Sequence, residues 1–376
     1  MALVCDYGSG FSKVGFSGSE FPRAMFPTVL GTPLHKSLFQ EENAKELFIG
    51  EETLENRRQL QLHHPILRAT VLNWSNMEKV GAASAGVWHH SFYQVLHISP
   101  EQYPLLITDP PLSTIKQKEN ILQILFEEFR VPGLYLANQA VLSLFASGQV
   151  SGTTIECGEG LTYCVPIVEG YSLQHSTLKM EVAGQDLTLY LMKLLAESGN
   201  TLVRKVGKDS IQDMKEKYCY VASKFDRDEE KTKVNTNTQT YHLPDGQEII
   251  LGSERFLCPE ILFQPDLIGI NSPGIHMMAF KSMNSCNPQH WDTLFGNILL
   301  TGGTGSCAGL QIRLQKEISK LAVPSMSVKV SSCPYSNCSA WIGGSILSSL
   351  STFKDMWIMH NDYKDVGSSI IRRRSP

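Results

Sequence analysis

Apolar and polar residues follow one another along the chain in a pattern that predicts alternating strands and helices. Near the start, apolar residues 2–5 and 14–16 flank a polar segment rich in glycine. This arrangement predicts two strands joined by a tight turn, because glycine adopts the positive φ angles that such turns require. A second stretch, residues 153–166, repeats the arrangement, and a third apolar run, residues 298–301, opens into another glycine-rich turn.

Between these stretches the apolar residues recur at helical or strand spacing. Helices are predicted at 116–129, 138–148, 183–197, 209–225, 310–321 and 341–353. Strands are predicted at 103–108, 133–136 and 326–330, and a hairpin with an Asp-Gly turn at 241–250. Because each glycine-rich hairpin precedes a long α/β segment, the sequence predicts a duplicated, two-lobed α/β protein.

The two hairpins also suggest chemistry. In the first, turn N–H groups together with Lys13 could bind a phosphate, and Asp6 at the mouth could hold a hydrated Mg²⁺. The second repeats the acid-x-Gly-x-Gly order with Glu156 and Gly158. An ordinary β-hairpin with a polar tip is the alternative for each, but their repetition favours a nucleotide held between two halves. The glycine spacing at 302–305 is not the Rossmann fingerprint.

Composition excludes several classes of protein. The net charge is −4 over 376 residues, which does not favour broad nucleic-acid binding. No stretch is apolar for long enough to span a bilayer, and the N-terminus lacks the basic start of a signal peptide. The 9 cysteines are odd in number and scattered, which is typical of reduced, buried thiols in a cytosolic protein.

Many stretches of the chain resemble actin, and the resemblance covers essentially its whole length. They are Asp6-x-Gly8-Ser9-Gly10-x-x-Lys13, residues 22–24, Asn73-Trp74, residues 139–144, 165–171, 183–188, 215–222 and 341–347. The chain is most similar to actin-related proteins, in particular to the divergent testis-type actin-related and actin-like proteins of animals. The resemblance implies the α/β fold of the actin-like ATPases, with two duplicated lobes and a nucleotide cleft.

The resemblance also implies a division into four subdomains and a set of binding residues. Subdomain 1 would comprise residues 1–27, 65–150 and 338–376; subdomain 2, 28–64; subdomain 3, 151–182 and 270–337; and subdomain 4, 183–269. ATP or ADP would bind with Mg²⁺ or Ca²⁺, the ion being held through water by Asp6 and Glu156. Phosphates would contact Ser9, Gly10, Lys13, Gly158, Glu159 and Gly160, and the adenosine would contact Lys215, Glu216, Gly302, Gly303 and Thr304. Gln139 would position the attacking water.

The departures from actin concern catalysis. Conventional actins have aspartate at both acids of the second hairpin, where this chain has Glu156 and Glu159, and a histidine at Tyr163. One methylene moves a carboxylate by about 1 Å, and a displacement of that size can cost about 10²-fold in rate. A phenol is a poor proton acceptor at neutral pH. Hydrolysis is therefore expected to be slow or absent, so the protein is expected to be a degenerate ATPase.

Other departures concern nucleotide and partners. Gln212, Cys307 and Asn337 replace an arginine, a tyrosine and a lysine on the adenosine side. The loop at 36–45 is charged, and residues 81–87 are inserted into a helix that is continuous in actins. The hydrophobic cleft that binds helices of actin partners keeps Phe145, Leu347, Leu350 and Met356, for which core packing is the alternative interpretation.

These observations lead to one functional expectation and two alternatives. We expect a structural protein of the cytoplasm and cytoskeleton that binds ATP weakly or without efficient hydrolysis. Its partners would be actin, actin-related proteins or cytoskeletal scaffold proteins, with no nucleic acid and no membrane insertion, and its place could be the perinuclear cytoskeleton of the sperm head. The alternatives are a polymerising actin-like ATPase and a nuclear actin-related subunit of a chromatin complex.

Overall fold

The computed structural model describes residues 1–34, 47–78, 86–200, 202, 206–223, 238–243 and 246–374. The chain forms two compact units. The first comprises Met1–Val150, Glu169–Gln174 and Cys338–Pro376, and the second Ser151–Val168 and His175–Asn337. The predicted loop at 36–45, most of the insertion at 81–87 and the Asp245 turn position lie outside the described residues.

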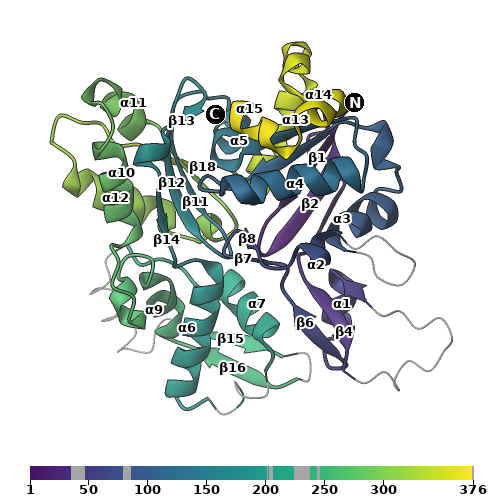
Figure 1. The fold of residues 1–376 in the computed structure, drawn as a ribbon. Coiled ribbons are helices and arrows are strands. Elements are labelled where there is room, and N and C mark those ends of the chain that lie inside the picture. The colour runs from purple at the N-terminus through teal and green to yellow at the C-terminus, as the bar shows by residue number, and fades with distance from the viewer. Residues whose placement is uncertain are drawn as a thin grey trace. The chain divides into compact units, whose positions relative to one another are not determined.

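The first unit is built on a six-stranded sheet with the order β19-β10-β9-β1-β2-β3 (Figure 1). Its strands are β1 (Leu3–Tyr7), β2 (Phe11–Phe16), β3 (Ala24–Pro27), β9 (Leu105–Asp109), β10 (Gly133–Asn138) and β19 (Ile358–Met359). Strand β1 pairs antiparallel with β2 and parallel with β9. The predicted first hairpin is therefore confirmed, and it lies at the centre of the sheet.

Helices cover both faces of this sheet because alternate residues of a strand point to opposite sides. Leu3 of β1 belongs to one buried cluster, with Leu122 of α4 (Ile115–Glu127). Val4 belongs to another, with Trp341 of α13 (Ser339–Ser349), whose indole Nε1 donates to the Val4 carbonyl at 2.9 Å.

Further elements complete the first unit. A small sheet contains β4 (Leu30–Pro33), β5 (Phe48–Ile49) and β6 (Leu60–His63), and β7 (Ile66–Leu67) pairs with β8 (Thr70–Val71). The helices are α1 (Glu51–Glu55), α2 (Trp74–Glu78), α3 (Val87–His89), a π-helix (His90–Val95), α5 (Gln139–Ala146), α14 (His360–Val366) and α15 (Ile371–Arg374). Strand β13 (Tyr171–Ser172) also belongs here.

The second unit repeats the strand arrangement of the first. Its sheet contains β11 (Gly152–Cys157), β12 (Thr162–Val168), β14 (Leu178–Met180), β17 (Ile298–Thr301) and β18 (Val330–Ser332). Strand β11 pairs antiparallel with β12 and parallel with β17, as β1 does with β2 and β9. The outer pairs also agree in direction: β17–β18 and β9–β10 are parallel, whereas β12–β14 and β2–β3 are antiparallel. The predicted duplication is thus visible in the topology.

The remaining elements of the second unit are mostly helical. They are α6 (Gly184–Glu197), α7 (Lys208–Tyr218), α9 (Glu254–Glu260), α10 (Ile275–Asn284), α11 (Trp291–Gly296) and α12 (Leu310–Leu321), with a hairpin of β15 (Gln239–His242) and β16 (Glu248–Leu251). Helix α12 matches its predicted bounds, and the hairpin is confirmed.

Most of the other predicted elements differ from the observed bounds by a few residues, and for two of them the structure shows the reason. Helix α7 ends at Tyr218 instead of Phe225, because Tyr220 forms a parallel bridge with Ala308 and the N–H of Val221 donates to the Ala308 carbonyl. The strand predicted to begin at Met326 begins at Val330, since the Met326 N–H closes a turn on the Val323 carbonyl.

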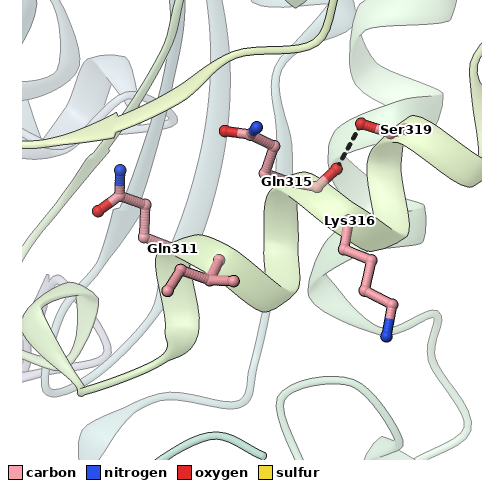
Figure 2. A pocket seen from close by; sticks show the side chains of 5 residues that line it. Gln311, Gln315, Lys316 and Ser319 are labelled. Carbon is pink, nitrogen blue, oxygen red and sulfur yellow. Dashed lines mark hydrogen bonds between the residues drawn. The ribbon is translucent and has the colours of Figure 1, made fainter. Parts of the chain in front are cut away.

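Helix α12 protects the edge strand of the second sheet. Gln311 and Gln315 project from the same side of α12, while Lys316 projects from the opposite side (Figure 2). Gln311 Nε2 donates to the Val330 carbonyl and Gln315 Oε1 accepts from the Val330 N–H, at 2.9 and 3.1 Å. Two side chains thus satisfy backbone groups of β18 that would otherwise be open to another strand.

Candidate functional site

The carboxylate of Asp6 is held inside the first hairpin. Asp6 lies opposite Lys13 in the β1–β2 register, and Lys13 Nζ donates to Asp6 Oδ2 at 2.8 Å. Asp6 is only 4% exposed, so it does not lie open at the mouth of the hairpin as the sequence predicted. Burial acts to raise the pKa of Asp6, but the charge of Lys13 and hydrogen bonds from Lys13, Thr108 and Gln139 outweigh it and hold the pKa below its usual value.

Two residues far along the chain complete this cluster. Thr108 Oγ1, at the end of β9, donates to Asp6 Oδ1 at 2.6 Å. Gln139 Nε2, at the start of α5, donates to Asp6 Oδ1 at 3.0 Å and to Thr108 Oγ1 at 3.2 Å. The structure therefore brings together Asp6, Lys13 and Gln139, as the resemblance implied, and adds Thr108, which the sequence analysis missed. Its only sequence signal is a polar residue that follows a buried apolar strand.

The tip of the first hairpin is suited to an anion. Within the described parts of the chain, the N–H groups of Ser9 and Gly10 have no hydrogen-bond acceptor, although the Gly8 N–H donates to the Phe11 carbonyl. Unpaired N–H groups next to a lysine form a concavity that favours phosphate oxygens. Ser9 Oγ accepts a hydrogen bond from the Ala69 N–H at 3.1 Å, so the β7–β8 turn supports this tip.

The supporting turn is strained. Arg68 and Ala69 are the two residues between β7 and β8, with φ angles of 45° and 56°. A two-residue turn with both φ angles positive favours Asn-Gly, because a Cβ atom is crowded in the left-handed region. The strain therefore lies directly beside the candidate phosphate site, where such strain is often found.

We predict that Ala69→Gly raises the free energy of unfolding by about 0.5–1 kcal/mol, since glycine removes the Cβ crowding but costs some unfolded-state entropy. Urea denaturation followed by circular dichroism measures this change. As a control, Ala196→Gly in α6 should lower the same free energy by up to about 1 kcal/mol. A loss of stability for Ala69→Gly would contradict the strain argument.

Three segments meet at the tip of the second hairpin. The Gly158 carbonyl accepts from the Gly184 N–H, at the start of α6, at 3.0 Å and from Thr304 Oγ1 at 2.9 Å. The Gln185 N–H donates to the Glu159 carbonyl at 2.9 Å. A Cβ on Gly184 would lie 2.5 Å from Glu159 Oε2 and 2.6 Å from Thr304 Oγ1, so a larger residue there would displace both side chains.

Lys215 joins this tip from α7. Its Nζ donates to the Gly184 carbonyl at 2.8 Å and lies 3.9 Å from Glu159 Oε2. Lys215 is 8% exposed, whereas the neighbouring Glu216 is exposed and accepts a hydrogen bond from Gln212. Burial raises the pKa of Glu159, although the charges of Lys215 and Lys208 oppose this. The carboxylate of Glu159, which is longer than the aspartate of conventional actins, thus lies near Lys215, the residue that the resemblance assigns to the adenosine.

The remaining acid of this hairpin lies opposite different residue types from those opposite Asp6. Glu156 pairs in register with Tyr163, the position that corresponds to Lys13 opposite Asp6. On its other side Glu156 lies opposite Thr301 of β17. The two hairpins therefore have the same backbone geometry but different partners for their acids.

The glycine-rich turn after β17 contacts the second hairpin through its backbone. Gly302 has a φ of 87°, and a Cβ there would lie 2.2 Å from the Cys157 carbonyl. Among the described residues, its chain neighbours apart, none has an atom within 4 Å of a Cβ placed on Gly303. Gly158, Glu159, Lys215 and Thr304 form one cluster, and Gly160 belongs to the same tip. The charge of Glu216 acts on Glu159, although its own hydrogen bond is with Gln212. Cys307 lies beside Cys219, with its Sγ 3.9 Å from that carbonyl, and Asn337 is exposed.

The residues present fit a nucleotide better than a directly bound metal. No group of three or more His, Cys, Asp or Glu side chains that could hold a metal ion occurs among the described residues. One or two carboxylates suffice for hydrated Mg²⁺, which keeps several of its waters, so the donor chemistry of Asp6 and Glu156 remains compatible with an ion held through water. The open N–H groups at Ser9 and Gly10 and the ammonium of Lys13 fit phosphate oxygens.

A comparison of the sequence with protein-family models identifies the family to which these clusters belong. The family model described as Actin matches residues 1–376. Among the helices of the described ranges, none combines the length and apolar character that a membrane crossing requires.

Proposed function

The chain belongs to the actin family, and we propose that it is a structural subunit of the cytoskeleton that binds ATP weakly and hydrolyses it slowly or not at all. The observation that carries this proposal is the difference between the two hairpins. In the first hairpin, the carboxylate of Asp6 accepts hydrogen bonds from Lys13, Thr108 and Gln139. In the second, Glu159 reaches Lys215, and Glu156 has tyrosine as its cross-strand neighbour.

The chain's own residues would act as follows when nucleotide is bound. Bound ATP with its divalent ion supplies the phosphoanhydride and the charge neutralisation. Lys13 and the N–H groups of Ser9 and Gly10 would hold phosphate oxygens, as would those of the second tip at 158–160. Lys215, with Glu216 and the turn at 302–304, would hold the adenosine side. Because Glu159 already engages Lys215, part of that contact is lost to the nucleotide, which supports weak binding.

We place this subunit in the cytoplasm, together with actin, actin-related proteins or cytoskeletal scaffold proteins, and propose the perinuclear cytoskeleton of the sperm head as its assembly. Partner docking is supported by a groove of about 330 Å³ in the first unit, lined by Phe145, Leu347, Leu350 and Met356 among others. Leu350 and Met356 are 50% and 47% exposed, which core packing does not explain. The four-subdomain division stays part of the proposal.

The nucleotide content of the purified protein tests this function. We predict about one ATP per chain after denaturation and chromatography of the released nucleotide when the protein is prepared in excess Mg·ATP. ADP at that level would show efficient hydrolysis and overturn the proposal. No bound nucleotide would also overturn the proposal, since packing and partners alone would then maintain the fold.

A polymerising actin-like ATPase is the second candidate, because the network around Gln139 is intact. The two functions differ in the release of phosphate during assembly. Filaments that form with stoichiometric phosphate release would favour the ATPase, whereas co-assembly with a partner protein without phosphate release favours the structural subunit.

A further inference from the structure

We infer that Thr108 is a positioning residue of the phosphate site: its hydroxyl group fixes the carboxylate of Asp6 and sets which atom Gln139 presents to a ligand. The role of Thr108 toward a bound nucleotide rests on the proposed function, whereas its hydrogen bonds with Asp6 and Gln139 do not depend on that function. Thr108 is 5% exposed, and its hydroxyl group joins two residues that the family resemblance assigned, Asp6 and Gln139.

The chemistry of the three groups determines their orientation. Asp6 forms an ion pair with Lys13 at 2.8 Å as a carboxylate, so Asp6 Oδ1 can only accept hydrogen bonds. Both Thr108 and Gln139 must therefore donate to it. The hydroxyl group of Thr108 donates its only proton to Asp6. Thr108 Oγ1 can therefore only accept the hydrogen bond from the second N–H of Gln139 Nε2.

The orientation of the Gln139 amide follows. With Nε2 bonded to both Asp6 and Thr108, the oxygen Oε1 is the amide atom that neither of them engages. An oxygen in that position can accept a proton of a water molecule, whereas an NH₂ group could not. Without Thr108, the amide of Gln139 would keep only its hydrogen bond to Asp6 and could rotate about that bond.

The second unit contains the same arrangement with one change. In the parallel pairing of β1 with β9, Cys5 lies opposite Ile107, which puts Asp6 beside Thr108 one position further on. In the equivalent pairing of β11 with β17, Glu156 lies opposite Thr301. Thr301 Oγ1 is buried and has no hydrogen-bond partner among the described residues. A threonine thus occupies the equivalent position in both units, but Thr301 does not hydrogen-bond the glutamate opposite it.

Hydrogen exchange of the Gln139 side-chain amide in ligand-free, full-length protein tests the inference. With ¹⁵N-glutamine labelling, the Gln139 signals are identified by their loss in Gln139→Leu. Thr108→Val should speed exchange of these amide protons by about 10-fold, the effect of one lost hydrogen bond. Thr108→Ser, which keeps the hydroxyl, should restore protection. Thr301→Val is the matched control, since it removes an unbonded hydroxyl at the equivalent position, and should leave the Gln139 signals unchanged.

Each other result overturns the inference. Unchanged exchange in Thr108→Val would show that the hydroxyl does not hold the amide. Equal acceleration in Thr108→Ser, or in Thr301→Val, would indicate a general loosening of the fold. These outcomes are separate from the proposed function, because a wild-type protein without bound nucleotide would refute that function and leave the amide measurement valid.

A double-mutant cycle tests the equivalence of the two threonines. Glu156→Asp should bring the carboxylate back to Thr301 and shift the urea midpoint upwards. The same change in a Thr301→Val background should give no such shift. An equal shift in both backgrounds would refute the equivalence.

Discussion

Replacing Asp6 with alanine is expected to lower the free energy of unfolding by about 3–5 kcal/mol, the range for breaking a buried ion pair by removing one partner. Lys13, whose side chain is 13% exposed, would keep its charge but lose the carboxylate 2.8 Å from its Nζ. Thr108 and Gln139 would lose their shared acceptor at the same time. Urea denaturation at neutral pH measures this loss, and ATP binding should be lost as well.

Two comparisons make this prediction specific. Glu197→Ala removes one partner of an ion pair with Lys193 in which both side chains are 60% exposed, and it should change stability by less than about 0.5 kcal/mol. Because the pKa of Asp6 is lowered in the folded state, its stabilisation is present above the ordinary value of 3.8 and is lost as the pH falls through the folded-state pKa. The difference between wild type and Asp6→Ala should therefore shrink in acid. A cost near that of Glu197→Ala would refute the buried-pair assignment.

Restoring the second hairpin is expected to raise the rate of ATP hydrolysis by about 10²-fold, the scale of a 1 Å misplacement. The variant combines Glu156→Asp, Glu159→Asp and Tyr163→His. The shorter acid at 159 no longer reaches Lys215, which lies 3.9 Å from the glutamate oxygen, and an imidazole can accept a proton at neutral pH. Phosphate release in a single turnover, with protein in excess over Mg·ATP, measures the rate.

A surface change of the same kind serves as the control for this variant. Glu197→Asp shortens an exposed acid of α6 and should leave phosphate release unchanged. If the triple variant gained no rate while binding ATP normally, the displaced carboxylates would not be what limits hydrolysis, and the geometric argument would fail.

The sequence alone determined the features that depend on neighbouring residues. Both hairpins, helix α12 and the duplicated order of strands and helices follow from local alternation, helical periodicity and glycine at the turns. The errors at the local level have local causes: α7 stops at Tyr218 because the next residues pair with Ala308, a partner that the helical pattern of α7 cannot reveal.

Only the tertiary structure determined which residues contact one another in the candidate site. Thr108 and Gln139 reach Asp6 across separations of 102 and 133 residues, and Lys215 meets Glu159 from a different helix. Such contacts depend on the register of strands that are distant in the chain, and a shift of one residue would turn each side chain to the other face of the sheet. Composition and spacing contain no information on that register, so the residues of the site could be named from the sequence, whereas their partners could not.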